Sequence, residues 1–390
     1  MIEQKLNRLY ESCGYRKFKM SKFEPYDLYA DNRDFLKSSQ LITFTDLDGS
    51  LLALKPDVTL SIVKANAGGE EKVYYNETVY RPKDRHYREI LQTGVECLGP
   101  LDRFAEAEVI ALAAQSLALV SDRFVIRISD AAFLKQLFES MELSDSTCEA
   151  VLRLFSMKNA AGFDSLVEEG RMTRACAETL KQLVDLYAPF REGIEVLSGF
   201  AMSNSAARLV EHLRALAEVL ESFGVLQHIY LDFSLVNSMD YYNGIIFQGA
   251  AENIPFTVLS GGRYDRLPEK MGKKVGAIGF AMYLDTIENY LSVPKHYDVD
   301  LLLLYEGEDN AVGTAARAAA LRSRGLRVRV IRADALETTE HPIRRRATGL
   351  PDGSYQLENG ENCTEDEMLQ QLLESDTVPA AESGKAVSHA

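Results

Sequence analysis

Residues 81–96 have the sequence RPKDRHYREILQTGVE, and this stretch decides the fold. Its first half is a polar, charged loop. Its second half begins a strand in which Gln92, Gly94 and Glu96 share one face, because side chains alternate along a strand. A sheet face with Gln and Glu on either side of a glycine is unusual for packing alone. It predicts the floor of a site for a small polar ligand, with an exposed sheet face as the alternative.

Strand-like segments lie on both sides of this stretch. Strands are expected at 72–80 and 88–98, and two apolar runs within residues 41–63 are joined by Asp48-Gly49, a step typical of a hairpin. After a long helical block, strand patterns return at 228–236, 243–249 and 255–260. Strands, then helices, then strands again indicate an α+β fold with an antiparallel sheet flanked by helices, not alternating βαβ units.

The chain is expected to contain two domains and a tail. Residues 1–295 form the core, in which residues 130–223 are a helical insertion, and a boundary is expected near Pro294. Residues 296–378 form a small α/β C-terminal domain that begins with a strand–helix–strand unit. Residues 379–390 are expected to be a disordered tail.

Composition limits the class of protein. The formal net charge of −15 disfavours a polyanionic partner, and the local cluster Arg344-Arg345-Arg346 is interpreted as a solvated turn. The five cysteines are scattered without a CxxC pair, so neither a metal site nor a disulfide framework is expected. The longest apolar runs have strand length, and the first residues mix charges from the start, so a cytoplasmic protein with no membrane span is expected.

Two further polar segments suggest a ligand site. Asp57 and Thr59 lie two residues apart at the end of a strand, where both can accept a hydrogen bond from a ligand ammonium group; a turn with a local cap is the alternative. The segment Asp240–Gly244 supplies tyrosine rings and hydroxyls, and the turn at residues 261–265 supplies glycines that let backbone approach a ligand closely.

These segments, in this order, resemble the core of the class II histidyl-tRNA synthetases. KPDVT at 55–59 is similar to the family's RPEGT, and residues 81–96 resemble motif 2 and its following strand. LVNSMDYYN at 235–243 resembles the histidine-specific LVRGLDYYN, SGGRYD resembles the GGRYD loop, and GAIGFAMYLDTI resembles motif 3. The similarity covers about residues 1–292, and the remainder is only faintly similar to the family's α/β anticodon-binding domain.

The resemblance assigns the two halves of the site differently. On the amino-acid side the family's groups remain, which implies histidine-binding roles for Asp57, Thr59, Gln92, Glu96, Tyr242 and Tyr264. On the ATP side, three family arginines are replaced by Thr78, Asn237 and Thr286. Arg81, Arg85 and Arg88 remain as candidates for residual anion contacts. Losing one preorganised donor typically costs about 10²–10³ in rate, so the loss of three is expected to abolish adenylation.

A retained histidine pocket beside a dismantled ATP pocket resembles the regulatory subunits of ATP phosphoribosyltransferase, which are synthetase paralogues. The resemblance implies a non-catalytic subunit that partners the short-form catalytic subunit in the first step of histidine biosynthesis, with L-histidine as feedback effector. It further implies a homodimer within a hetero-oligomer, and neither a cofactor, a metal, a tRNA nor a membrane. The alternatives are an active histidyl-tRNA synthetase and a histidine- or tRNA-binding regulator with another partner.

Overall fold

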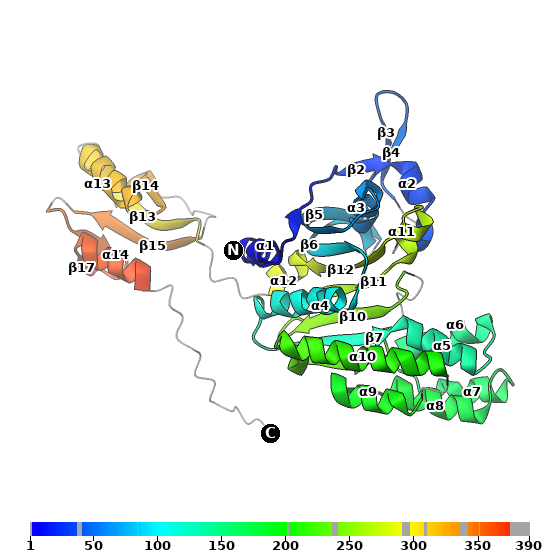
Figure 1. Cartoon of the computed structure of the whole chain (residues 1–390). Coiled ribbons are helices and arrows are strands. Elements are labelled where there is room, and N and C mark those ends of the chain that lie inside the picture. The colour runs from blue at the N-terminus through cyan, green and yellow to red at the C-terminus, as the bar shows by residue number, and fades with distance from the viewer. Residues whose placement is uncertain are drawn as a thin grey trace, which may run out of the picture. The chain divides into compact units, whose positions relative to one another are not determined.

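The computed structural model describes residues 2–36, 41–83, 85–200, 203–235, 241–290, 297–307, 310–335, 342–350 and 352–374. The chain divides into two compact units, Met1–Ser292 and Val293–Ala390 (Figure 1). In the first unit, helices lie on both faces of a large sheet. The second unit has a separate, smaller sheet.

The large sheet has the strand order β1-β5-β6-β12-β11-β10-β7-β9-β8 within the described residues. Neighbouring strands are antiparallel, except for the parallel pairs β1–β5 and β7–β9. The strands are β1 Arg16–Lys17, β5 Glu71–Lys83, β6 His86–Gly99, β7 Phe124–Asp130, β8 Tyr187–Pro189, β9 Ile229–Asp232, β10 Ile245–Ala251, β11 Leu259–Arg263 and β12 Gly276–Tyr283. The predicted α+β class with a mainly antiparallel sheet is confirmed.

Strands β5 and β6 form a long hairpin that carries the stretch at 81–96. The expectation of a polar loop before residue 88 is wrong for most of that segment, because the ladder continues to the pair Lys83 and His86. Charged side chains suit such an extension since they stay exposed, as Arg85 and Arg88 do. The turn itself is tight, and Arg85 adopts a positive φ of 66° there.

A second, three-stranded sheet has the order β2-β4-β3. Its strands are β2 Phe23–Pro25, β3 Thr43–Thr45 and β4 Leu51–Leu54. The predicted hairpin at Asp48-Gly49 is confirmed, because Thr45 pairs with Leu51 and Gly49 adopts φ 88°. Only glycine takes this backbone conformation without a steric cost.

Two hydrophobic cores cover opposite faces of the large sheet. One face packs on α1 Ile2–Ser12 and α4 Arg103–Ala118 through residues such as Tyr74 and Val95. The other face packs on α2 Tyr26–Ala30, η1 Arg33–Phe35, α3 Thr59–Ala65 and α11 Arg266–Lys270 through residues such as Val73 and Tyr75. Helix α12 Leu284–Tyr290 follows β12 and contacts β6, where Asp285 accepts a hydrogen bond from the Leu91 backbone. Successive residues of β5 thus serve different cores.

Between β7 and β9 the chain is almost wholly helical (Figure 1). The helices are α5 Ala131–Ser140, α6 Asp145–Ser156, α7 Gly162–Glu168, α8 Arg174–Val184, α9 Phe190–Ser198, α10 Asn204–Ser222 and η2 Leu226–His228. Side-chain oxygens of Asp130, Ser144, Thr173 and Ser203 cap four of them by accepting backbone N–H groups. The sequence encodes these helix starts locally.

The second unit contains the sheet β14-β13-β15-β16-β17. Its elements are β13 Val299–Tyr305, α13 Ala311–Ser323, β14 Val328–Arg332, η4 Ala333–Ala335, β15 Ile343–Gly349, β16 Tyr355–Leu357, β17 Asn362–Cys363 and α14 Glu365–Glu374. β13 and β14 are parallel and joined by α13, as predicted. The interpretation of Arg344-Arg345-Arg346 as a turn is wrong, because these residues lie in β15 and pair with β13. The expected tail at 379–390 lies outside the described residues.

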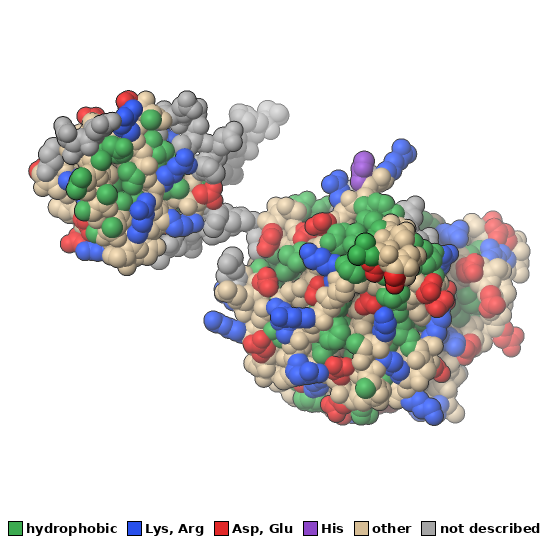
Figure 2. Space-filling model, turned by 90° about the horizontal axis from the view of Figure 1, so that it is seen from above, with side chains coloured by type: hydrophobic (Ala, Val, Ile, Leu, Met, Phe, Trp, Pro, Cys, Tyr) green, Lys and Arg blue, Asp and Glu red, His purple; other side chains and the backbone are tan. Residues whose placement is uncertain are grey.

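Acidic and basic side chains are interspersed over the visible face of the larger unit (Figure 2). The net charge of −15 is therefore not gathered into one acidic region on that face. Mixed charge of this kind favours solubility over long-range attraction of one class of ion. A specific ligand site has to be sought in cavities.

Candidate functional site

One cavity of about 240 Å³ lies on the face of the large sheet that packs on α2 and α3. All six residues expected to bind histidine line it: Asp57, Thr59, Gln92, Glu96, Tyr242 and Tyr264. They come from the segment before α3 and its first residue, from β6, from the segment before β10 and from the turn after β11. The expectation that Asp57 and Thr59 lie at the end of a strand is wrong, because β4 ends at Leu54 and Thr59 begins α3. The fold thus brings together groups that are up to about 200 residues apart, from Asp57 to Tyr264.

Glu96 forms the cavity floor and is only 2% exposed. Thr59 donates its hydroxyl to one carboxyl oxygen of Glu96 at 2.6 Å, and Tyr264 donates its hydroxyl to the other. Burial raises the pKa of Glu96 to about 8, although both hydrogen bonds oppose the shift. At neutral pH the Glu96 carboxyl group is therefore mainly a neutral acid that can donate its proton to a ligand.

Glycines keep the floor open around this carboxyl group. Gly279 of β12 pairs with Glu96, and a Cβ there would overlap the Glu96 carboxyl oxygen. A Cβ on Gly94 would overlap the carbonyl oxygen of Phe280 and come within 2.6 Å of the Tyr75 hydroxyl. Neither position tolerates a side chain, because an added Cβ would meet the backbone of the adjacent strand and, at Gly279, also the Glu96 carboxyl group.

Asp57 and Arg81 form an ion pair in the cavity wall, with 3.5 Å between Asp57 Oδ2 and Arg81 Nη2. Asp57 Oδ1 also accepts the backbone N–H of Leu60 at 2.9 Å. The alternative of a local cap is therefore present, and it uses only Oδ1 of the two carboxyl oxygens. Arg81 Nε donates to the carbonyl oxygen of Pro56 at 2.6 Å, which fixes the guanidinium.

Gln92 and a group of tyrosines complete the wall. The amide nitrogen of Gln92 is buried and has no hydrogen-bond partner within the described chain. An unpaired buried donor costs about 1–3 kcal/mol, so a ligand acceptor at this point would be favoured. Tyr241 packs edge-on against both Tyr242, at 4.8 Å between ring centroids, and Phe35, at 5.9 Å. Burial raises the pKa of Tyr242 and Tyr264 well above the ordinary value, so both remain protonated donors.

The other residues singled out in the sequence do not join this cavity. Arg85 and Arg88 are exposed on the hairpin, so of the three expected anion contacts only Arg81 lines the site. Thr78 pairs with Leu91, whereas Glu77 pairs with Gln92. Because faces alternate, Thr78 points away from the cavity. Thr286 lies in α12 and is not among the residues that line the cavity, and Asn237 lies outside the described residues.

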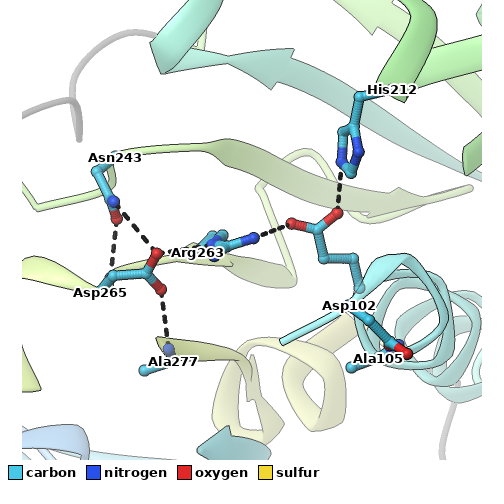
Figure 3. A network of polar contacts seen from close by, with 8 residues as sticks. Asp102, Ala105, His212, Asn243, Arg263, Asp265 and Ala277 are labelled. Carbon is cyan, nitrogen blue, oxygen red and sulfur yellow. Dashed lines mark hydrogen bonds and ion pairs between the residues drawn. The ribbon is translucent and has the colours of Figure 1, made fainter. Parts of the chain in front are cut away.

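A polar network outside the cavity holds two of its walls (Figure 3). Arg263 donates to Asp265 at 2.8 Å and to the buried Glu106 of α4 at 2.7 Å. Glu106 also contacts His212 of α10 at 2.6 Å. The hydrogen bond to Glu106 raises the pKa of His212, and both partners together lower the pKa of Glu106 despite its burial.

The same network ties the tyrosine segments together. Asn243 accepts the backbone N–H of Asp265 at 2.8 Å, and Asp265 accepts that of Ala277 at 2.9 Å (Figure 3). Asn243 follows Tyr242, and Asp265 follows Tyr264. The network therefore fixes the segments from which both tyrosines reach the cavity.

Sequence reasoning missed several lining residues. Tyr75 and Phe35 line the cavity but were not expected as ligand contacts, and Tyr241 was expected only as part of the segment Asp240–Gly244. Alternation along β5 could have identified Tyr75, which pairs with Gly94 on the floor face. No local signal marks Phe35, which reaches the cavity from η1 through tertiary packing alone.

The described residues contain no group of His, Cys, Asp and Glu side chains arranged to hold a metal ion. No helix within the described ranges is long and apolar enough to cross a membrane.

Comparison with known proteins identifies the family to which this fold belongs. The family model for histidyl-tRNA synthetase matches residues 1–287. A solved histidyl-tRNA synthetase from Nostoc has 17% identity and a TM-score of 0.75, with 96% of this chain and 94% of that chain covered. The chain therefore belongs to the histidyl-tRNA synthetase family.

Within that family, two similar relatives carry the name of a regulatory subunit. The ATP phosphoribosyltransferase regulatory subunit of Caldanaerobacter subterraneus subsp. tengcongensis is 30% identical over 298 residues, covering 73% of this chain and 76% of the relative. The subunit of the same name from Acetivibrio thermocellus is 28% identical over 345 residues, which cover 84% of this chain and 82% of the relative. The chain is a member of this regulatory-subunit branch.

Proposed function

We propose that this chain is the non-catalytic regulatory subunit of an ATP phosphoribosyltransferase, that it assembles with the short-form catalytic subunit, and that its cavity binds L-histidine as the feedback signal of histidine biosynthesis. The observation that carries the ligand assignment is the meeting of six expected side chains in one cavity of about 240 Å³. This volume lies below the roughly 300–1,000 Å³ of pockets for drug-sized ligands, so it suits a single amino acid.

The polar groups of the cavity match those of histidine. Asp57 is an anion for the α-ammonium group. At the floor, Glu96 in its protonated form can donate to a neutral imidazole, or transfer the proton and pair with imidazolium. The aromatic rings of Tyr242 and Tyr264 enclose the flat imidazole. Histidine thus finds a complementary partner at both ends.

The same cavity is poorly equipped for adenylation. Adenylation of an amino acid needs cations at the phosphates of ATP, where charge develops in the transition state. Among the described lining residues, Arg81 is the only Lys or Arg. We therefore expect no histidine-dependent exchange between ATP and pyrophosphate by the purified chain. Robust exchange would instead identify an active synthetase.

The regulatory role is tested by reconstitution with a short-form catalytic subunit. The two chains should co-purify, and formation of phosphoribosyl-ATP should be inhibited by L-histidine. The Glu96→Ala variant should still co-purify with the catalytic subunit but require more histidine for inhibition. An unchanged inhibition constant would remove the cavity from the feedback mechanism. If the two chains co-purify but histidine has no effect, the assignment of the catalytic partner would stand and the assignment of histidine as effector would be rejected.

A homodimer is part of the proposal and is supported by exposed apolar side chains. Phe23, Phe44 and Leu51 are 43%, 38% and 46% exposed on the small sheet, and the rings of Phe23 and Phe44 pack edge-on at 5.4 Å. Clustered exposed apolar groups commonly mark protein interfaces. Phe44→Glu is expected to shift the chain to monomers in light scattering, whereas Phe256→Glu, at a phenylalanine that is 57% exposed, is not.

The proposal also places the chain in the cytoplasm and gives it no tRNA ligand. Contacts to a phosphate backbone need several cations, and the chain carries a net charge of −15. Binding of labelled tRNA(His) at moderate salt would argue against this part of the proposal. Binding of the catalytic subunit would be unaffected by that result.

A further inference from the structure

Arg81 stands out among the residues around the cavity because it is the only cation among the described lining residues. Its side chain is 14% exposed. It lies on the floor face of β5. Glu77 is on that face because it pairs with Gln92, and Arg81 is four residues further along the strand, so its side chain points to the same face. The guanidinium therefore sits at the cavity wall on the same sheet surface as the ligand-binding strand β6.

The guanidinium of Arg81 is held in place by two contacts, and some of its N–H donors remain available to a ligand. Nε donates to the Pro56 carbonyl oxygen at 2.6 Å, and Nη2 lies 3.5 Å from Asp57 Oδ2. An arginine has five N–H donors in a rigid fork. Within the described part of the chain, Nη1 has no recorded acceptor, so donors remain for a ligand. This prior fixing of the plane reduces the entropy lost when an anion binds.

Asp57 and Arg81 together present opposite charges side by side. A free amino acid carries the same two charges, an ammonium and a carboxylate, one carbon apart. Asp57 suits the ammonium, and Arg81 offers the charge-assisted hydrogen bonds that planar carboxylates prefer. The unpaired amide nitrogen of Gln92, on the neighbouring strand, is a further donor for a carboxylate oxygen.

We propose that Arg81 is a specificity-determining residue that makes the site require a free carboxylate on its ligand. The site takes the amino acid itself and rejects analogues in which an alcohol, amide or ester replaces the carboxylate. This inference rests on the proposed histidine site. It separates the site from that of an aminoacylating enzyme, which must also hold the amino acid after its carboxylate has attacked the α-phosphate of ATP, released pyrophosphate and formed a mixed anhydride.

Calorimetric titration with L-histidine and L-histidinol tests the inference, because histidinol keeps the imidazole and the ammonium and lacks only the carboxylate. The full chain should bind histidine roughly 10–100-fold more tightly than histidinol, as expected for one charge-assisted pair. In Arg81→Met, the ratio of the two affinities should fall to about one. Arg88→Met is the matched control, since Arg88 is the exposed cross-strand partner of Arg81 and should leave the ratio unchanged.

The ratio separates recognition from a structural effect. Damage to the cavity weakens both ligands together and leaves the ratio as it was, which would overturn the inference. Equal binding of both ligands by the wild type would also overturn it, even if no Arg81 variant folds. Arg81→Lys keeps the charge but not the fork, and an intermediate ratio is expected. If the wild type binds neither ligand, the proposed function fails and this inference fails with it.

Discussion

Tyr264 and Glu96 are buried side by side at the floor of the cavity, and the Tyr264 hydroxyl donates a hydrogen bond to the Glu96 carboxyl group. Each residue is 2% exposed, so neither can exchange its partner for water. Thr59 occupies the other carboxyl oxygen. The floor therefore has a fixed orientation before any ligand arrives, which reduces the entropic cost of binding.

Tyr264→Phe should weaken histidine binding by about 10-fold, because the substitution removes the donor that orients Glu96 and leaves one buried carboxyl oxygen without its partner. The free energy of unfolding should fall by about 1 kcal/mol. Titration calorimetry and urea denaturation measure the two effects. Tyr187→Phe is the control, since Tyr187 is 48% exposed and far from the cavity-lining set. Binding within twofold of the wild type would contradict the role of the hydroxyl.

Glu96→Gln should remove a pH dependence from stability. The folded pKa of Glu96 is raised to about 8 from 4.5, so between these values the folded state binds more protons than the unfolded state. Its contribution is therefore present below pH 4.5 and lost as pH rises through 8, with a slope of at most about 1.4 kcal/mol per pH unit. Relative to the wild type, Glu96→Gln should gain stability from pH 5 to pH 9 in urea denaturation. Parallel curves would mean that Glu96 is ionised when folded.

Gly279→Ala should block the floor of the cavity. The added methyl group would overlap the Glu96 carboxyl group, and the backbone of β12 cannot retreat because it is paired on both sides. Histidine binding should fall by at least about 10-fold, and overpacking should cost about 1–3 kcal/mol of stability. In Gly69→Ala the new methyl group meets nothing within 4 Å, so this variant should resemble the wild type. Wild-type binding by Gly279→Ala would exclude this floor from the ligand site.

His212→Gln should remove a contribution to stability that is present at low pH and lost as pH rises. The folded pKa of His212 is raised by its hydrogen bond to Glu106. The stability that this pair contributes is therefore present below the ordinary histidine value near 6.5 and lost as pH rises through the raised folded value. The difference between wild type and variant should shrink from pH 6 to pH 9.

The floor of the site was predictable because its signals are local. The alternation that puts Gln92, Gly94 and Glu96 on one face needs only a regular strand, and β6 is regular throughout its pairing with β5. The same rule shows why Thr78 does not meet the cavity, since it is an odd number of positions from Glu77 and Arg81 on the floor face. Family resemblance had placed Thr78 by its position in a motif and not by its face.

Other features depended on tertiary packing and left no local signal. Glu106 and Arg263 are 157 residues apart, and only the packing of α4 against the sheet joins them. The arginine cluster in β15 was mistaken for a turn because its strand is half-exposed, so its composition is that of a surface segment. The charged tip of the β5–β6 hairpin was predicted to be a loop for the same reason, since its strand residues are exposed. Solvent-exposed ladders lack the apolar pattern that identifies strands.

The bond between Asn243 and Asp265 has a consequence for how a ligand could enter. Asn243 follows Tyr242, and Asp265 follows Tyr264. Because Asn243 and Asp265 are hydrogen-bonded to each other, the two tyrosine walls are held together and cannot move apart independently. The third side of the cavity is built differently, from Phe35 and Leu36 at the end of a short 3₁₀ helix. We therefore expect small molecules to enter and leave the cavity past Phe35 and Leu36, while the two tyrosine walls stay fixed.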